Sequence, residues 1–382
     1  MQVSVRRIAR DTLIVLGVSF GLLVALEIFL RLFAPQSLTG RPVRGDHFSV
    51  PDPLLGSRYI PGAVWRFRHP EYEVEYAINA AGFRDTTTRT REKPLGVTRI
   101  LLLGDSFTFG LGVNYEQTWP VIAERELKRQ GMAIDLIKAG REGADTRSEL
   151  ILLRRLARTY HIDAVILGFL INDLYTNVPY APSTSDSSTK EKKGSNQQSV
   201  FRQVGQYRTF HLLTLVRRML QSIDLSYILI YLAAPARGEY LRLPLSEAPA
   251  RQLNVTETLL RQVAAFCDSL GKPLIVYSLP QQFQVLYASS GRADPRIDVG
   301  YYDRHFTQVA ATAGFQWVAT VDAFVEARKS IDADLFYPLD GHFTSAGNSV
   351  AAQIFIHRVL PQLQRSLVPS KKEVQSSPNF TR

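Results

Sequence analysis

The sequence R-I-L-L-L-G-D-S-F-T-F-G-L-G, residues 99–112, places Ser106 directly after a run of aliphatic residues. In an open parallel sheet, ligands bind beyond the carboxyl ends of the strands. A serine at such an end exposes its hydroxyl group while its own backbone N–H points to the same place, and these are two parts of an acyl-transfer site. Gly-Asp-Ser is also an ordinary turn sequence, and this segment alone is better explained as a structural turn.

Three further segments place polar groups after other predicted strands. Gly143, in K-A-G-R-E-G-A-D-T, offers an unhindered backbone N–H, and Asn172, in G-F-L-I-N-D, offers a side-chain amide. Asp340 and His342, in D-G-H-F-T-S-A-G-N, place a carboxylate beside an imidazole. Separately, these residues are explained as a turn, a helix N-cap and one histidine among seven. Together they supply a nucleophile, a base, an orienting carboxylate and oxyanion donors.

Short aliphatic runs alternate with amphipathic segments from Arg99 onward, which indicates a parallel sheet covered by helices on both faces. Thr146 and Glu149 form a capping-box pattern, and Gly131 and Gly271 stand where helices are expected to end. The predicted strands are 100–103, 134–137, 164–169, 274–279 and 316–319. The predicted helices are 118–130, 148–160, 256–269, 304–313 and 345–360.

The four segments resemble the sequence blocks of the SGNH family of GDSL hydrolases, which are centred on Ser, Gly, Asn and His. The match consists of G-D-S-F at 104–107, Gly143, Asn172 and D-G-H at 340–342, over roughly 99–363. The resemblance implies an α/β fold, a three-layer α/β/α sandwich with a flavodoxin-like parallel sheet. It also implies that Ser106 is the nucleophile, His342 the general base and Asp340 its orienting carboxylate. The implied oxyanion hole consists of the Ser106 and Gly143 N–H groups and the Asn172 amide.

Two features depart from the common family pattern. Leu170 stands where many members have Gly, and His342 follows Asp340 by two positions where three are common. The shorter spacing is similar to that of membrane-linked and periplasmic relatives, including alginate-type O-acetyltransferases. The segment I-N-A-A-G-F-R-D at 78–85 is also similar to one that precedes G-D-S-F in anchored bacterial members.

The segment from Thr12 to Ala34 is long enough to cross a bilayer, with about twenty apolar residues. Arg6, Arg7 and Arg10 precede it, which favours a cytoplasmic N-terminus and an extracytoplasmic catalytic domain, periplasmic or at the cell surface. A cleaved signal peptide is the main alternative, but its apolar core spans only about 7 to 15 residues. We therefore expect a retained single-pass anchor.

Glu27 and Arg31 lie four residues apart on one face of this segment, and we expect them to form an ion pair. The predicted domain organisation has four parts. These are a cytoplasmic stub and transmembrane anchor at 1–36, an extended lead-in with short strands at 37–98, the catalytic domain at 99–365, and a disordered tail at 366–382. The catalytic domain is expected to carry a polar insertion at 182–199 and a helical insertion at 204–243.

Composition excludes several classes of function. The net charge of +10 comes from scattered basic residues, which favours attraction to anionic lipid or acidic glycan over nucleic-acid binding. The single cysteine, Cys267, excludes a disulfide framework and a cysteine metal site. No histidines occur at metal-ligand spacing, and we expect neither a metal nor a cofactor.

The sequence thus favours a membrane-anchored serine esterase or deacylase that acts through an acyl-serine intermediate. Its expected substrate is an acylated extracytoplasmic glycan or lipid-linked saccharide. An O-acyltransferase of exopolysaccharide or envelope modification would use the same residues with a sugar acceptor. A non-catalytic glycan-binding or scaffold protein is the third alternative. Partners in envelope assembly are not identified by the sequence.

Overall fold

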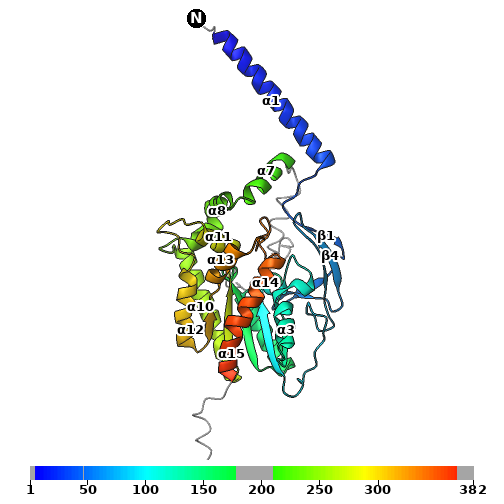
Figure 1. Ribbon diagram of the computed structural model, residues 1–382, viewed down its shortest axis with the longest axis vertical. Helices are drawn as coiled ribbons and strands as arrows, with labels where there is room; N and C mark the ends of the chain where they lie inside the picture. The colour runs from blue at the N-terminus through cyan, green and yellow to red at the C-terminus, as the bar shows by residue number, and fades with distance from the viewer. Residues whose placement is uncertain (1–4, 46, 178–209, 368–382) are drawn as a thin grey trace, which may run out of the picture. The chain divides into compact units, whose positions relative to one another are not determined.

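The computed structural model describes residues 5–45, 47–177 and 210–367 (Figure 1). The predicted polar insertion at 182–199 and nearly all of the predicted tail lie outside these residues. The chain divides into two compact units. One comprises 1–40 with 181–227, and the other comprises 41–180 with 228–382.

The larger unit contains a five-stranded parallel sheet in the order β10-β9-β8-β6-β7. Its strands are β6 (Thr98–Gly104), β7 (Ile134–Lys138), β8 (Ala164–Leu170), β9 (Leu274–Leu279) and β10 (Gln316–Val318). Every residue of β8 and β9 is buried, as expected for parallel strands covered on both faces. This strand order is the flavodoxin-like one, so the predicted α/β class and sheet are confirmed.

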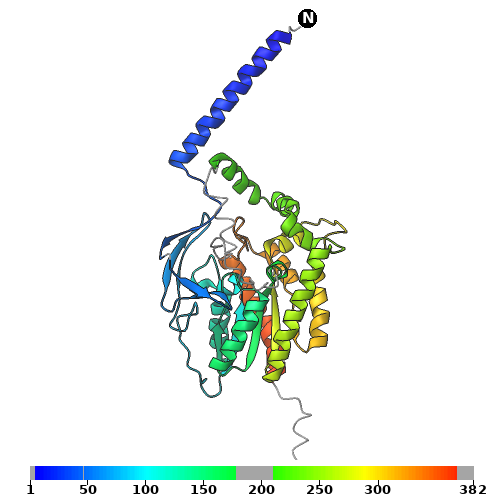
Figure 2. The same cartoon turned by 180° about the vertical axis from the view of Figure 1, so that it is seen from behind.

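Helices cover both faces of the sheet. Helix α3 (Trp119–Arg129) packs against α14 (Ser345–Ile354) on the face seen in Figure 1. Helix α4 (Thr146–Thr159) packs against α10 (Glu247–Ser269) on the opposite face, which Figure 2 shows from behind. Other helices of this unit are α2 (Ser106–Phe109), α5 (Asp173–Thr176), α11 (Gln282–Ser289), α12 (Tyr301–Ala313), α13 (Val321–Ser330) and α15 (Leu360–Leu367). A π-turn at Phe355–Val359 joins α15 to α14.

The ends of several helices differ from the predicted ones. Asp145, not Thr146, is the N-cap of α4, and its side chain forms the capping box with Ser148. Helix α10 begins at Glu247 rather than near 256, and α11 and α13 were not predicted. Gly131 and Gly271 do follow helix ends in the left-handed conformation, as the sequence suggested.

The lead-in contains short strands, as predicted, and they pair into two small sheets. Strands β1 (Arg41–Arg44), β4 (Val64–Arg68) and β5 (Glu73–Ala77) form an antiparallel sheet, and β2 (Ser49–Asp52) pairs with β3 (Gly56–Tyr59). Its buried aromatic residues pack against Phe109 of α2, so this sheet is attached to the turn that carries Ser106.

The smaller unit contains α1 (Val5–Phe33) and α7 (His211–Gln221). Within α1, residues 7–33 are long and apolar enough to cross a membrane. The predicted pair is present, since Arg31 donates to Glu27 over 2.7 Å. The segment predicted as a helical insertion also includes α8 (Asp224–Ala233), α9 (Pro235–Gly238) and a 3-10 turn at Glu239–Leu241.

Candidate active site

Ser106 is the first residue of α2, immediately beyond the carboxyl end of β6. Asp105 caps this short helix by accepting a hydrogen bond from the Phe107 N–H over 2.9 Å. Gly110 ends it in the left-handed conformation, with φ of 80°. The chain therefore makes a tight strand-to-helix turn with Ser106 at its start.

The loop before α14 brings a base and a carboxylate to this serine. Nε2 of His342 lies 2.8 Å from Oγ of Ser106, and Nδ1 of His342 lies 2.6 Å from Oδ2 of Asp340. The rings of Phe107 and Phe343 pack edge to face at 4.7 Å, and Phe107 also contacts the imidazole ring. These distances are those that a nucleophile, its base and the orienting carboxylate require.

Burial and the neighbouring negative charge shift the pKa of His342 in opposite directions. Burial favours its neutral form, but the negative charge and hydrogen bond of Asp340 favour the imidazolium, and the net pKa is raised above its usual value. Burial likewise tends to raise the pKa of Asp340, yet the charge and hydrogen bond of His342 outweigh this and lower it. Asp340 therefore remains ionised while it holds the imidazole.

The predicted oxyanion donors lie at adjacent strand ends. The N–H of Ser106 belongs to the first turn of α2, outside the helical hydrogen-bond pattern. Nδ2 of Asn172, after β8, donates to Oδ2 of Asp105 over 3.3 Å, and Asn172 makes no side-chain cap on α5. Its place beside Asp105 brings the amide to the same turn as Ser106.

Gly143 lies in the loop after β7, with φ of 70°. Two residues earlier, the N–H of Arg141 donates to the carbonyl oxygen of Gly104 over 2.9 Å, which joins this loop to the end of β6. The N–H of Gly143 has no hydrogen-bond acceptor among the described residues. The loop therefore leaves a donor free near the Ser106 turn.

Arg84 supports the turn and was not among the predicted site residues. Its guanidinium donates to the carbonyl oxygens of Phe109, Gly110 and Val113 over 3.0, 2.6 and 2.6 Å. The side chain is almost fully buried, and burial lowers its pKa to about 10. The sequence drew attention to segment 78–85 only through its resemblance to anchored relatives, which gave no reason to connect Arg84 with α2.

Asp173 follows Asn172 but belongs to the core. It is buried and accepts a hydrogen bond from Oγ1 of Thr146 over 2.5 Å. Burial raises its pKa well above the usual value. Among the described residues, no group of three His, Cys, Asp or Glu side chains is arranged to hold a metal ion.

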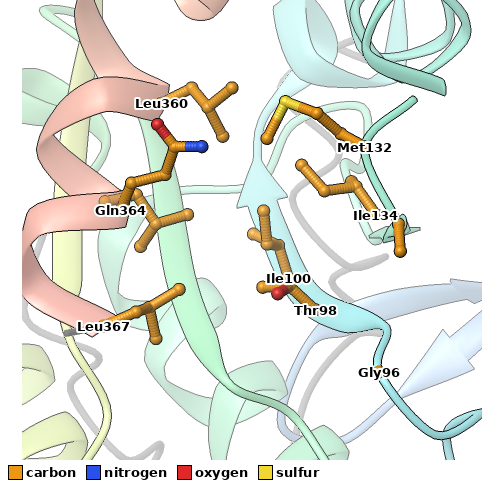
Figure 3. A pocket seen from close by; sticks show the side chains of 10 residues that line it. Gly96, Thr98, Ile100, Met132, Ile134, Leu360, Gln364 and Leu367 are labelled. Atoms are coloured by element: carbon orange, nitrogen blue, oxygen red, sulfur yellow. The ribbon is translucent and has the colours of Figure 1, made fainter. Parts of the chain in front are cut away.

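A separate apolar hollow of about 180 Å³ lies at the other end of the sheet (Figure 3). Thr98 and Ile100 at the start of β6 line it, together with Leu360 and Leu367 of α15. The seven residues of β6 separate it from Ser106 by roughly 20 Å. This hollow has no part in the arrangement around Ser106.

A comparison with known protein families gives a match. The model of the GDSL-like lipase/acylhydrolase family matches residues 102–350. No curated protein matches the sequence.

The chain is also similar to several solved structures, at low sequence identity and with TM-scores of 0.40 or below. They include TesA, at 13% identity over 70% of this chain and 99% of that chain, with a TM-score of 0.40. They also include the psychrotrophic esterase EstA from Pseudoalteromonas sp., at 13% identity over 70% of this chain and 99% of that chain, with a TM-score of 0.39. A catalytic mutant of an acetylxylan esterase from Geobacillus stearothermophilus is 16% identical over 72% of this chain and 97% of that chain, with a TM-score of 0.40.

The family model covers well over half of the chain and includes the turn with Ser106 and the loop with His342. The chain therefore belongs to the GDSL-like lipase/acylhydrolase family, and it is an SGNH-type hydrolase that acts on esters.

Proposed function

We propose that this protein is a membrane-anchored serine esterase that removes acyl groups from an extracytoplasmic glycan or lipid-linked saccharide. The observation that carries the proposal is the continuous chain of contacts from Asp340 through His342 to Ser106, with distances of 2.6 and 2.8 Å. In this chain Ser106 is the nucleophile and His342 the base.

The proposed reaction is a double displacement. Oγ of Ser106 attacks the ester carbonyl carbon while Nε2 of His342 takes the hydroxyl proton. The tetrahedral oxyanion accepts hydrogen bonds from the Ser106 and Gly143 N–H groups and the Asn172 amide. The C–O bond of the ester then breaks, His342 gives its proton to the departing alcohol, and an acyl-serine remains. Water attacks this ester with His342 as base, and the carboxylic acid leaves as Ser106 is regenerated.

Side chains beside Asn172 support a saccharide substrate. Tyr175, one turn further along α5, is half-buried, and its ring lies 5.3 Å from that of Tyr240. The amide of Gln281 donates to the Tyr175 hydroxyl over 3.2 Å. Aromatic faces combined with oriented amides suit sugar rings, which present both C–H faces and hydroxyl groups. The net charge of +10 favours an acidic glycan among these substrates.

Contacts within the smaller unit support retention of α1 as an anchor. Glu27 accepts hydrogen bonds from the N–H groups of His211 and Leu212 over 3.0 and 2.8 Å. Gln36 donates its N–H to Nδ1 of His211 and accepts from Arg218 over 2.7 Å. Removal of α1 would leave the first turn of α7 without these partners.

An O-acyltransferase would use the same residues, with a sugar hydroxyl in place of water. Product analysis separates the two reactions. We would incubate the full chain in nanodiscs with an acetylated oligosaccharide and an excess of an unacetylated acceptor, and measure free acetate and acetylated acceptor by mass spectrometry. An esterase releases acetate in proportion to substrate consumed, and Ser106→Ala releases none. Acetyl groups recovered mainly on the acceptor would replace the hydrolytic proposal with the transferase.

A further inference from the structure

The turn between β4 and β5 contacts the loop that carries the catalytic base. Oε1 of Glu71 accepts the N–H of Leu339 over 2.9 Å, and Oε2 accepts the N–H of Asp340 over 2.9 Å. One carboxylate thus binds two consecutive backbone donors that lie 268 and 269 positions further along the chain. Hydrogen bonds to a charged acceptor are about twice as strong as neutral ones.

The loop at 337–342 is closed by its own hydrogen bonds, and Glu71 contacts its outer part. The N–H of Tyr337 donates to the His342 carbonyl over 2.9 Å, and the N–H of Gly341 donates to the Tyr337 carbonyl over 2.7 Å. These bonds fix the base of the loop. The contacts of Glu71 add a second point of attachment at Asp340, the residue whose side chain must face His342.

Neighbours of Glu71 reinforce this attachment. Burial and the negative charge of Asp340 raise the pKa of Tyr72, so the Tyr72 hydroxyl lies close to the Asp340 carboxylate. The Tyr72 ring packs against His69 at 4.8 Å and against Tyr337 at 4.9 Å. The turn therefore binds the Asp340 backbone and places a second polar group close to its side chain.

Glu73, two residues away, shows what a carboxylate with only a structural role does on this hairpin. It is 36% exposed and pairs with Arg68 and Arg66 on the neighbouring strand β4. Exposed pairs of this kind contribute little to stability. Glu71 is only 13% exposed, and each of its oxygens accepts a backbone N–H of the catalytic loop, while Oε2 also lies 3.6 Å from Nδ1 of His69 in the same turn.

We propose that Glu71 is a positioning residue for catalysis: its carboxylate fixes the backbone at Leu339 and Asp340 and so holds the Asp340 carboxylate on Nδ1 of His342. The lead-in sheet then helps to set the geometry of the active site. This inference rests on the proposed function, in which His342 activates Ser106.

The test compares Glu71→Gln with the matched control Glu73→Gln in the full chain. A glutamine at 71 keeps one acceptor and turns an NH₂ group toward a backbone N–H, so one bond is lost. We would measure the rate at which a small organophosphonate labels Ser106, kcat and KM for an activated acetyl ester, the pH dependence of both reactions, and thermal unfolding.

We expect Glu71→Gln to label and turn over about 10- to 100-fold more slowly, because a misplacement near 1 Å costs up to about 100-fold. The substitution should lower kcat and leave KM within about twofold of wild type. The acidic limb of the pH profile should move to lower pH, because a displaced Asp340 carboxylate stabilises the protonated form of His342 less. Glu73→Gln should match wild type. Glu71→Asp keeps the charge and reaches one N–H, so its labelling rate and kcat should lie between those of wild type and Glu71→Gln. It replaces Glu71→Gln in the test if Glu71→Gln does not fold.

Two negative results have different meanings. If the wild type is not labelled at Ser106, the proposed function itself fails. If the wild type is labelled and the Glu71 variants react at the same rate with the same pH midpoint, only the role of Glu71 is overturned. A lower unfolding temperature with an unchanged pH midpoint would also overturn it, because Glu71 would then be purely structural.

Discussion

His342 lies 2.8 Å from Ser106 through its Nε2 atom, although 236 positions separate the two residues. The topology explains the contact, because Ser106 follows β6, which lies between β8 and β7 in the sheet, and His342 lies in the loop that leads into α14. Since the same imidazole also lies 2.6 Å from Asp340, the three groups are in place before any substrate binds.

Ser106→Ala should abolish formation of an acyl-enzyme. The variant keeps the oxyanion donors and the base but lacks the attacking oxygen, so we expect hydrolysis of an activated acetyl ester to fall at least about 1000-fold. Intact-mass measurement after rapid mixing detects the acetyl adduct in the wild type. Ser349→Ala removes an exposed hydroxyl on α14 and should match wild type. Equal activity of Ser106→Ala and wild type would refute the assignment.

Asp340→Asn should change the pH dependence as well as the rate. His342 acts as a base only when neutral, and its raised pKa means that activity falls as the pH drops through a midpoint above the usual value of 6.5. The substitution removes the charge that opposes burial, so the pKa of His342 falls and the midpoint of the acidic limb moves to lower pH. The plateau rate should fall about 100- to 10,000-fold. A midpoint that stays in place or rises would contradict this account.

Gly168→Ala should displace the turn that carries Ser106. A Cβ at Gly168 would lie 2.3 Å from Oγ1 of Thr108, which is buried in α2. We expect a loss of about 1–3 kcal/mol in the free energy of unfolding, together with reduced activity. Thr108→Ala removes the obstructing oxygen, which has no hydrogen-bond partner among the described residues. In a double-mutant cycle Thr108→Ala should rescue Gly168→Ala, and additive losses would disprove the contact.

The sheet and the grouping of Ser106, His342 and Asp340 were predictable because their signals are local. Buried parallel strands such as β8 are continuous apolar runs, and the polar residues that follow them stand out against those runs. Helix α11 was missed because six of its eight residues, Gln282–Tyr287, are buried, which leaves no amphipathic period to detect. Helix α13 was missed for the opposite reason, since Phe324 is its only buried residue.

The support of the site was not predictable from local signals. The strands of the lead-in are four or five residues long, and nothing in them indicates what they pack against. The roles of Arg84 and Glu71 depend on backbone groups that only the folded chain brings to them. Contacts between a side chain and a distant backbone carry no sequence pattern, because any residue type supplies the backbone partner.

Retention of α1 predicts a measurable role for Glu27. Its carboxylate caps α7 at His211 and Leu212, so Glu27→Gln should increase hydrogen exchange at these amides by roughly fivefold, equivalent to a capping loss of about 1 kcal/mol. Glu247→Gln, on exposed Glu247 of α10, is the control and should leave α7 unchanged. The measurement uses the full chain in nanodiscs, with intact mass read on the same sample. A mass that lacks roughly the first 30 residues would show that α1 is a removed signal segment. An intact mass with exchange in α7 that does not respond to Glu27→Gln would overturn the capping role of Glu27. The predicted change requires both that α1 stays attached and that Glu27 holds the first turn of α7.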